Sequence, residues 1–459
     1  MELTEKYTVK DLFDKAEDKT ITELEGSLLT FGGYVRFNRF GGNIGFLTIN
    51  DGSCFENLQI VYSDKKNDAI KMGASLEVTG KLHITPEAKQ PFEIQAENIT
   101  LIGDVDDSYP LQKKKMGFEY LRTLPQWRMK TNTFNAVFRV RSTLAYYIHQ
   151  YFHSHGYYWI HTPILTANDC EGEGQTFNVN ADPKKPEEFF GKDNVHLTVS
   201  GQLHVEPFAL AYGKVYTFGP TFRAEKSNTT RHAAEFWMIE PEIAWADLSD
   251  LCDIEEDFLK YVVRNTVADC AQDMKFFTQW VDKNLMETVN SFIDKPFRRV
   301  RYEEAIQILS DAVKAGHHFD VSDIHFGLDL GSEHERYLTE QVFHGPIFLT
   351  DYPKDIKAFY MKQNDDEKTV GACDLLVPNI GELCGGSQRE CDYQKLLSRM
   401  EDLKMNIPAY EWYLDLRRNG SIPHSGFGLG FERLVMLVTG MTNIRDTLPY
   451  PRCYKDMEF

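Results

Sequence analysis

The stretch "FGPTFRAEKSNTTRHAAEFWMIEPE" (residues 218–242) joins the alternating pattern of a β-hairpin to two arginines, one histidine and four glutamates. Side chains two positions apart on a strand share a face, so Arg223 and Glu225 should point the same way. The polar "KSNTTRH" should form the connecting loop. By the same parity, the return strand presents four side chains on one face: Phe236, Met238, Glu240 and Glu242. The hairpin therefore predicts a sheet surface that carries both fixed charges and an aromatic ring.

Two interpretations explain these charges. A cross-strand ladder of ion pairs accounts for the charges but not for the aromatic residues between them. A nucleotide accounts for both, because arginine forks bind phosphate oxygens, a carboxylate accepts from an exocyclic amine, and an aromatic face stacks on a purine. The sequence has neither a P-loop nor a Rossmann glycine motif after a strand, so the hairpin itself would hold the phosphates.

The chain has 459 residues, which is too many for one ordinary domain, so we expect two. Within residues 27–104, five short alternating strands separated by glycine predict a small closed barrel. A helical stretch, "DKKNDAIKMG", falls between the third and fourth strands, where barrels of the oligonucleotide-binding type place theirs. We assign residues 1–104 to this barrel and residues 105–130 to a linker.

The remaining residues, 131–459, mix helices and strands. "NAVFRVRSTLAYYIHQYFHSHG" has helical spacing and ends at Gly156, whereas "YYWIHTPILT" reads as a strand. Because proline cannot donate to a sheet ladder, Pro163 places that strand at an edge or a subunit boundary. We expect a helical insertion near residues 250–345, and "SGFGLGFERLVMLVTG" should pass from a glycine-rich turn into an apolar helix. This order predicts an α+β fold with an antiparallel sheet.

The composition excludes several classes of protein. The net charge of −19 argues against indiscriminate nucleic-acid binding. Residues 111–130 nevertheless hold six basic residues and one acid. This segment is either a local contact surface for nucleic acid or a solvated linker. No apolar run approaches a membrane span, and the charged N-terminus does not resemble a leader peptide. Eight scattered cysteines without a C-x-x-C pair indicate reduced thiols. We therefore expect a cytoplasmic protein without membrane contact.

Three motifs carry a resemblance that covers nearly the whole chain. "FRAE" followed by "RH", the earlier "GYYWIHTPIL" and the terminal "GFGLGFERL" resemble the three ordered signatures of class II aminoacyl-tRNA synthetases. With the barrel in front of them, they resemble the subgroup that charges aspartate, asparagine or lysine. The resemblance implies a catalytic domain on an antiparallel sheet flanked by helices, and a homodimer whose interface includes Pro163.

The resemblance also implies how ATP is held. It places Arg223 at the α-phosphate, where a fixed cation stabilises the developing charge. Glu225 would lie near the adenine amine and Phe236 would stack on the adenine ring. The remaining implied ATP contacts are Arg231, His232, Glu382, Gly430 and Arg433. Arg433 would act with Arg223 in catalysis, although it could instead form an ordinary ion pair in the first turn of a helix.

The folded phosphates of ATP need a cation to offset their charge, so we expect Mg2+ as a cofactor. Asp374 and Glu382 match the metal-binding acids of the subgroup. Without that resemblance they would read as two loop acids in water.

The predicted amino acid is asparagine. The segment "SGQLHVEPF" (residues 200–208) resembles a stretch in aspartate enzymes of the subgroup that contains a lysine, which pairs with the side-chain carboxylate of the substrate. This chain has Val205 at that position. The side-chain carboxylate of an aspartate substrate would therefore lack a partner. Arg389 matches the arginine that grips the side-chain oxygen, and Glu240 could accept from an amide nitrogen but would repel a carboxylate. Glu171, in a loop that should close over the substrate, and Gln202 match further contacts to the amino acid.

The barrel should read the anticodon. By the resemblance, Phe46 stacks on a base and Gln59 hydrogen-bonds a base edge, although Phe46 could instead belong to the barrel core. A basic stripe that includes Lys113, Lys114 and Lys115 should also meet the tRNA.

The sequence thus predicts a ligase. The carboxylate of L-asparagine attacks ATP to give asparaginyl-adenylate and pyrophosphate, and the terminal ribose hydroxyl of tRNA(Asn) then takes the acyl group. One alternative is an aspartate ligase that tolerates both tRNAs, which Val205 and Glu240 disfavour. A second is an RNA-binding or regulatory module without catalysis, which the retained signature arginines disfavour. A third, a tRNA-independent ammonia ligase, would lack the barrel.

Overall fold

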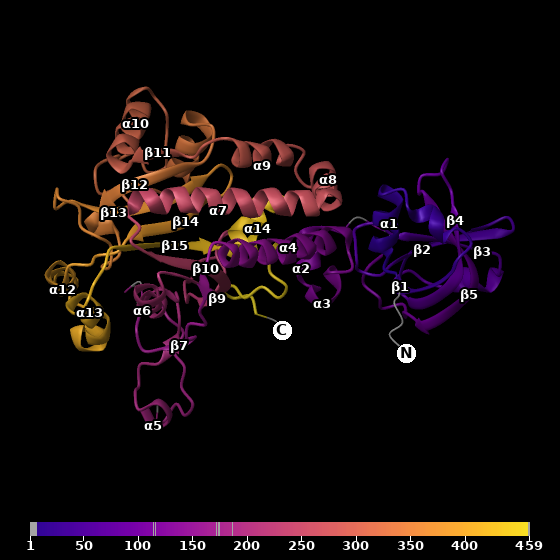
Figure 1. The fold of residues 1–459 in the computed structure, drawn as a ribbon, viewed down its shortest axis with the longest axis horizontal. Coiled ribbons are helices and arrows are strands. Elements are labelled where there is room, and N and C mark those ends of the chain that lie inside the picture. The colour runs from indigo at the N-terminus through magenta and orange to yellow at the C-terminus, as the bar shows by residue number, and fades with distance from the viewer. Residues whose placement is uncertain are drawn as a thin grey trace. The chain divides into compact units, whose positions relative to one another are not determined.

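The computed structural model describes residues 7–112, 114, 116–170, 172, 175–185 and 187–457. The chain divides into two compact units, Met1–Ala136 and Val137–Phe459. The elements of each unit are labelled in Figure 1.

The first unit is built on the predicted barrel. Its five strands are β1 (Leu28–Gly41), β2 (Ile44–Asn50), β3 (Leu58–Tyr62), β4 (Ser75–Ile84) and β5 (Phe92–Gly103). They close in the order β1-β2-β3-β5-β4. A 3-10 helix, η2 (Lys65–Ala69), joins β3 to β4 as the sequence predicted. Helix α1 (Val9–Glu17) contributes Val9 and Leu12 to the barrel core. The five-stranded barrel of the OB-fold is confirmed.

The region expected to be a linker carries two short helices, α2 (Phe118–Arg122) and α3 (Pro125–Arg128). Lys130, just after α3, lies against β1. Its ammonium is 5.3 Å from the centroid of the Tyr34 ring and 5.4 Å from that of Trp127. Burial lowers the pKa of Lys130. Residues after the barrel therefore pack on its side rather than trailing in solvent.

The second unit contains an eight-stranded sheet. Its strands are β6 (Tyr158–Trp159), β9 (Lys214–Phe222), β10 (Glu235–Ala244), β11 (Arg298–Arg301), β12 (Ile347–Pro353), β13 (Thr369–Val377), β14 (Gly381–Gln388) and β15 (His424–Gly430). Their order is β11-β12-β13-β14-β15-β10-β9-β6. The outermost pairs, β11 with β12 and β6 with β9, are parallel, and the inner pairs are antiparallel. The predicted α+β fold on an antiparallel sheet is confirmed.

Two local predictions were wrong. "YYWIHTPILT" is not one strand: β6 ends the large sheet, whereas β7 (Leu165–Thr166) pairs with β8 (His196–Leu197) in a separate sheet. Pro163 lies between them in neither strand, because it has no N–H for a ladder.

The glycine-rich "SGFGLG" is not a turn but the inner strand β15. Its glycines make room for side chains of β10, since a Cβ at Gly426 would lie 2.2 Å from the Glu242 Oε1 and one at Gly428 2.5 Å from the Met238 Cε.

Helices flank the sheet, except α5, which lies at the tip of a segment that projects away from it (Figure 1). They are α4 (Asn132–Ser154), α5 (Glu187–Phe190), α6 (Gln202–Tyr212), α7 (Leu248–Asp269), α8 (Ala271–Trp280), α9 (Leu285–Asp294), α10 (Tyr302–Lys314), α11 (Ser332–Arg336), α12 (Tyr393–Asp402), α13 (Glu411–Arg418) and α14 (Phe431–Thr439). Helix α7 begins with a capping box at Asp247 and packs along the sheet, with the Phe258 ring 6.0 Å from that of Phe427. None of the described helices is long and apolar enough to cross a membrane.

Candidate active site

The charged hairpin forms as the sequence predicted. β9 and β10 pair antiparallel up to Phe222 and Glu235, and the Arg223 N–H continues the pairing by donating to the Ala234 carbonyl at 3.0 Å. The Arg223 Nη1 lies 3.9 Å from the Glu225 Oε1, so both side chains point the same way. The predicted face of β10 is also correct, because each of its four side chains lines one of two cavities.

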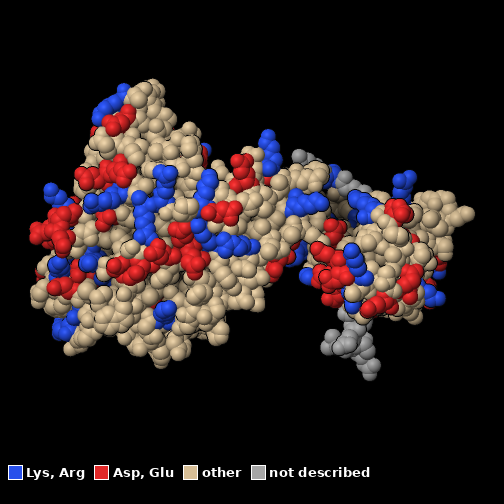
Figure 2. Space-filling model, turned by 45° about the horizontal axis from the view of Figure 1, so that its top comes forward, with Lys and Arg blue, Asp and Glu red and all other residues tan. Residues whose placement is uncertain are grey.

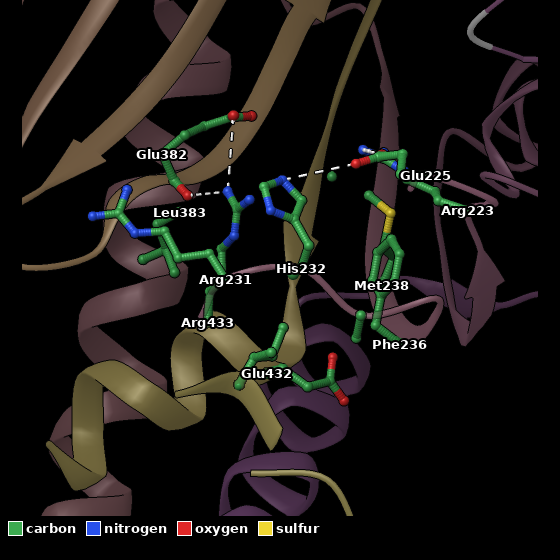
Figure 3. Close-up of a pocket in the computed structure, with 14 residues that line it drawn as sticks. Arg223, Glu225, Arg231, His232, Phe236, Met238, Glu382, Leu383, Glu432 and Arg433 are labelled. Carbon is green, nitrogen blue, oxygen red and sulfur yellow. Dashed lines mark hydrogen bonds and ion pairs between the residues drawn. The ribbon is translucent and has the colours of Figure 1, made fainter. Parts of the chain in front are cut away.

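The first cavity measures about 110 Å³ and lies at the end of the hairpin (Figure 3). It gathers every residue that the sequence assigned to ATP: Arg223, Glu225, Arg231, His232, Phe236, Glu382, Gly430 and Arg433. The guanidinium of Arg223 lies 5.4 Å from the centroid of the Phe236 ring. The cavity therefore combines an aromatic face with several cations, which suits a purine and its phosphates.

One ion pair and one contact between a histidine and a carboxylate shape this cavity (Figure 3). The Arg433 Nη1 donates to the Glu382 carbonyl and lies 3.8 Å from its carboxylate. The His232 Nε2 lies 3.8 Å from the Glu225 carboxylate. Burial lowers the pKa of His232, so its ring is neutral at pH 7.

The second cavity measures about 170 Å³ and contains the residues assigned to the amino acid that the structure describes, Gln202, Glu240 and Arg389. It shares four residues with the first: Arg223, Met238, Glu382 and Gly428. The two cavities therefore adjoin, and Arg223 stands where they meet. Glu171, the other residue assigned to the amino acid, lies outside the described residues.

Arg389 and Glu240 are held by different partners. Arg389 donates to Glu242 through Nε at 3.2 Å and through Nη2, and its Nη1 donates to the Ser387 hydroxyl at 2.8 Å. Glu240 accepts from the Ser200 hydroxyl and from the Gly201 N–H at 2.8 Å. Burial raises the pKa of Glu240 against these hydrogen bonds. The cavity thus offers a fixed cation and a fixed carboxyl group to one substrate.

Val205 is not one of the described residues that line this cavity. It is fully buried in a small apolar cluster with Ala209 and Val215. Val205 therefore brings neither a cation nor a contact to the cavity.

The two acids assigned to a metal converge. A Cβ at Gly385 would lie 3.0 Å from the Glu382 Oε1 and 3.5 Å from the Asp374 Oδ1, so both oxygens face the same point above this glycine. Glu335 lies close by, and burial together with the charges of Glu382 and Asp374 raises its pKa to about 7. Carboxylate oxygens around one point are the donors that Mg2+ prefers, so these residues fit the ion.

Lys357 also reaches this acidic group. Its Nζ lies 2.5 Å from the Asp374 Oδ2 and 3.9 Å from the centroid of the Tyr352 ring. Neither Lys357 nor Glu335 was predicted from the sequence. Nothing in the local sequence distinguishes them from surface charges, because their partners lie on other strands.

A separate buried network adjoins the second cavity. Glu206, Glu242 and His424 are the one group of three or more such residues in the described part of the chain whose ligand atoms are close enough for a metal. Arg417 pairs with Glu206 at 2.7 Å and Arg389 pairs with Glu242, so the acidic charge is already matched by arginine.

In the barrel, Phe46 is on the outer surface and not in the core. It is 40% exposed and lies opposite Arg39 on β1. Gln59 faces the same side, and its Nε2 donates to the Glu93 carboxylate at 3.0 Å. Phe37, also 40% exposed, extends this surface and was not predicted from the sequence.

The expected basic stripe is only partly described, since Lys113 and Lys115 lie outside the described residues. On the face of the second unit visible in Figure 2, acidic and basic side chains are interspersed.

The class of protein follows from comparison with known families and structures. The family described as tRNA synthetases class II (D, K and N) matches residues 121–454, and the OB-fold nucleic acid binding domain matches residues 29–102. The chain belongs to the class II tRNA synthetases of this D, K and N family.

Individual relatives have more specific names than the family. The chain is 51% identical to an asparagine–tRNA ligase of Clostridium beijerinckii, over 98% of this chain and 99% of that protein. It is 48% identical to an asparagine–tRNA ligase of Ureaplasma urealyticum, over 98% and 99%. Its structure is similar to that of asparaginyl-tRNA synthetase from Pyrococcus horikoshii complexed with asparaginyl-adenylate, with a TM-score of 0.87, 33% identity, and 99% and 100% of the two chains covered.

Proposed function

We propose that this chain is an asparagine–tRNA ligase that activates L-asparagine with ATP and transfers the asparaginyl group to the 3′ end of tRNA(Asn). The observation that carries the proposal is the position of Arg223 in both cavities. ATP in the first cavity and the amino acid in the second would meet at its guanidinium. The relatives named for asparagine support the choice of amino acid.

Activation needs no side-chain nucleophile. A carboxylate oxygen of asparagine attacks the α-phosphorus, the bond from that phosphorus to the bridging oxygen breaks, and pyrophosphate leaves. Arg223 stabilises the charge on the α-phosphate, Phe236 stacks on adenine, and Arg433 holds the nucleotide from the other side. In the second step the ribose hydroxyl of tRNA attacks the carbonyl carbon of the adenylate and AMP leaves.

Selection of asparagine depends on the two ends of its carboxamide. The Arg389 guanidinium, fixed by Glu242, donates to the carboxamide oxygen, and Glu240 accepts from its nitrogen. An aspartate in the same position would set its carboxylate against Glu240, which costs affinity.

Asp374 and Glu382 would hold Mg2+. When bound, the ion offsets the negative charge of the ATP phosphates. Lys357 would keep Asp374 ionised when the ion is away.

We further propose a homodimer. The segment around Pro163 exposes several large apolar side chains, which is typical of a buried interface: Tyr158, Trp159, Ile164 and Leu165. The outer barrel surface with Phe46 and Gln59 would bind the anticodon, and a cytoplasmic location stays a prediction.

Aminoacylation tests the proposal. A tRNA(Asn) transcript is incubated with the full chain, ATP, Mg2+ and labelled asparagine or aspartate, and acylated tRNA is counted. Labelling with asparagine alone is expected. Labelling with aspartate alone would overturn the amino-acid assignment, and no labelling with either would favour a non-catalytic RNA-binding module.

A further inference from the structure

Glu206 lies on α6, one helical turn after Gln202, which lines the second cavity, and Glu206 is completely buried. Its carboxylate accepts from donors on α6, α13 and β15. The donors are the Gln202 Nε2 at 3.1 Å, the Tyr413 hydroxyl at 2.8 Å, the Arg417 Nη2 at 2.7 Å and the His424 Nε2 at 3.0 Å. A buried carboxylate with this many donors is unusually well satisfied.

Glu206 is ionised despite its burial. Burial alone would raise its pKa, but the Arg417 guanidinium and the His424 ring outweigh burial and hold the pKa below its ordinary value. Arg417 is itself fully buried beside it. An ionised carboxylate can only accept hydrogen bonds.

This fixes the amide of Gln202. Because Glu206 offers no donor, the Gln202 side chain must turn its NH2 group toward Glu206, as the 3.1 Å hydrogen bond shows. Its Oε1 is then the end available to the cavity that Gln202 lines with Glu240 and Arg389. Within the described part of the chain, no group donates a hydrogen bond to this Oε1.

We propose that Glu206 is a positioning residue for the amino-acid substrate: it orients the Gln202 amide so that its Oε1 accepts from the substrate's α-ammonium group. The inference rests on the proposed function. The ammonium is the substrate group that needs acceptors, because the carboxamide nitrogen is already assigned to Glu240 and Glu242 is paired with Arg389. A flipped Gln202 would set its own N–H groups against the ammonium.

The test compares asparagine with succinamate, which is asparagine without its amino group. Binding of both compounds is measured with the full-length chain. The measure for asparagine is its KM in ATP–pyrophosphate exchange, and the measure for succinamate is its inhibition constant in the same assay. In Glu206→Gln, residue 206 can donate and Gln202 is free to flip. The KM for asparagine should rise roughly tenfold, while the inhibition constant of succinamate and the KM for ATP stay within about twofold.

Tyr413→Phe is the matched control, because it removes another hydrogen bond to Glu206 and leaves the one from Gln202 in place. It should keep the wild-type ratio of asparagine to succinamate binding. A folded Glu206→Gln variant with an unchanged ratio, or one that weakens both ligands equally, overturns the inference.

Gln202→Met covers the case in which Glu206→Gln does not fold, since it leaves the other donors to Glu206 intact. It should show the same selective loss for asparagine, and an unchanged ratio would again overturn the inference. Failure of the proposed function is separate, because it would appear as absent asparagine exchange in the unsubstituted chain.

Discussion

The ammonium of Lys357 lies 2.5 Å from the carboxylate of Asp374, in a cavity wall that also contains Glu382. Both partners are largely buried, with side chains 17% and 11% exposed. Removing one partner of such a pair leaves an uncompensated buried charge.

Lys357→Met should therefore lower the free energy of unfolding by about 3 kcal/mol. Denaturant unfolding in EDTA measures the change. Lys357→Arg keeps the cation and should lose clearly less. Equal stability of Lys357→Met and the unsubstituted chain would show that Asp374 is not charged in the folded state.

Glu335 should make stability fall as the pH rises. Its pKa is about 7 in the folded chain against 4.5 for the free group. Between these two pH values, Glu335 is protonated in the folded chain and ionised in the unfolded chain. Its contribution to the free energy of unfolding is therefore full below about pH 4.5 and is lost as the pH rises through 7. Glu335→Gln should remove this slope, gaining up to about 3 kcal/mol relative to the unsubstituted chain between pH 4.5 and pH 8. Parallel slopes for the two proteins would contradict the assignment.

Arg223→Lys keeps a charge but loses the fork that binds two phosphate oxygens. We expect the exchange kcat to fall about 100- to 1000-fold, because the lost interaction stabilises the transition state. Lys226→Ala, in the neighbouring loop, is the control and should stay within about twofold. If only the KM for ATP changed, Arg223 would bind the nucleotide without acting on the reaction.

Glu240→Gln should weaken discrimination between asparagine and aspartate. The neutral side chain no longer repels a substrate carboxylate, so the ratio of kcat/KM for the two amino acids should shift toward aspartate by roughly tenfold. Exchange kinetics with each amino acid give this ratio. A variant that loses both activities equally would place Glu240 in the support of the cavity and not in selection.

The barrel residues should affect tRNA alone. Phe46→Ala and Gln59→Ala should each raise the KM for tRNA(Asn) by about tenfold, because base stacking and base-edge contacts are each worth about 1–3 kcal/mol. Pyrophosphate exchange without tRNA should be unchanged. Leu28→Ala, at an exposed position elsewhere on β1, is the control.

Features that depend on residues close together in the sequence were predictable. The alternation along β10 placed Phe236 and Glu240 on one face because strand parity is a local property, and the five barrel strands were found for the same reason. The family resemblance, the α+β fold and the activity toward asparagine agree with the comparisons.

Contacts between distant segments were not predictable in this way. Lys357, in the segment after β12, meets Asp374 on β13, and Glu335 approaches from the helix α11. The strand character of the "SGFGLG" segment depends on side chains of β10 that fill the space above its glycines, which no local pattern reveals. The surface position of Phe46 was left open because an aromatic residue on a barrel strand can face either side.

ATP–pyrophosphate exchange with asparagine and with aspartate, each with Mg2+ and without tRNA, tests the central claim most directly. It isolates formation of the adenylate at the junction of the two cavities. Exchange with asparagine and not with aspartate is the predicted result. Exchange with aspartate and not with asparagine would contradict the roles given to Arg389 and Glu240.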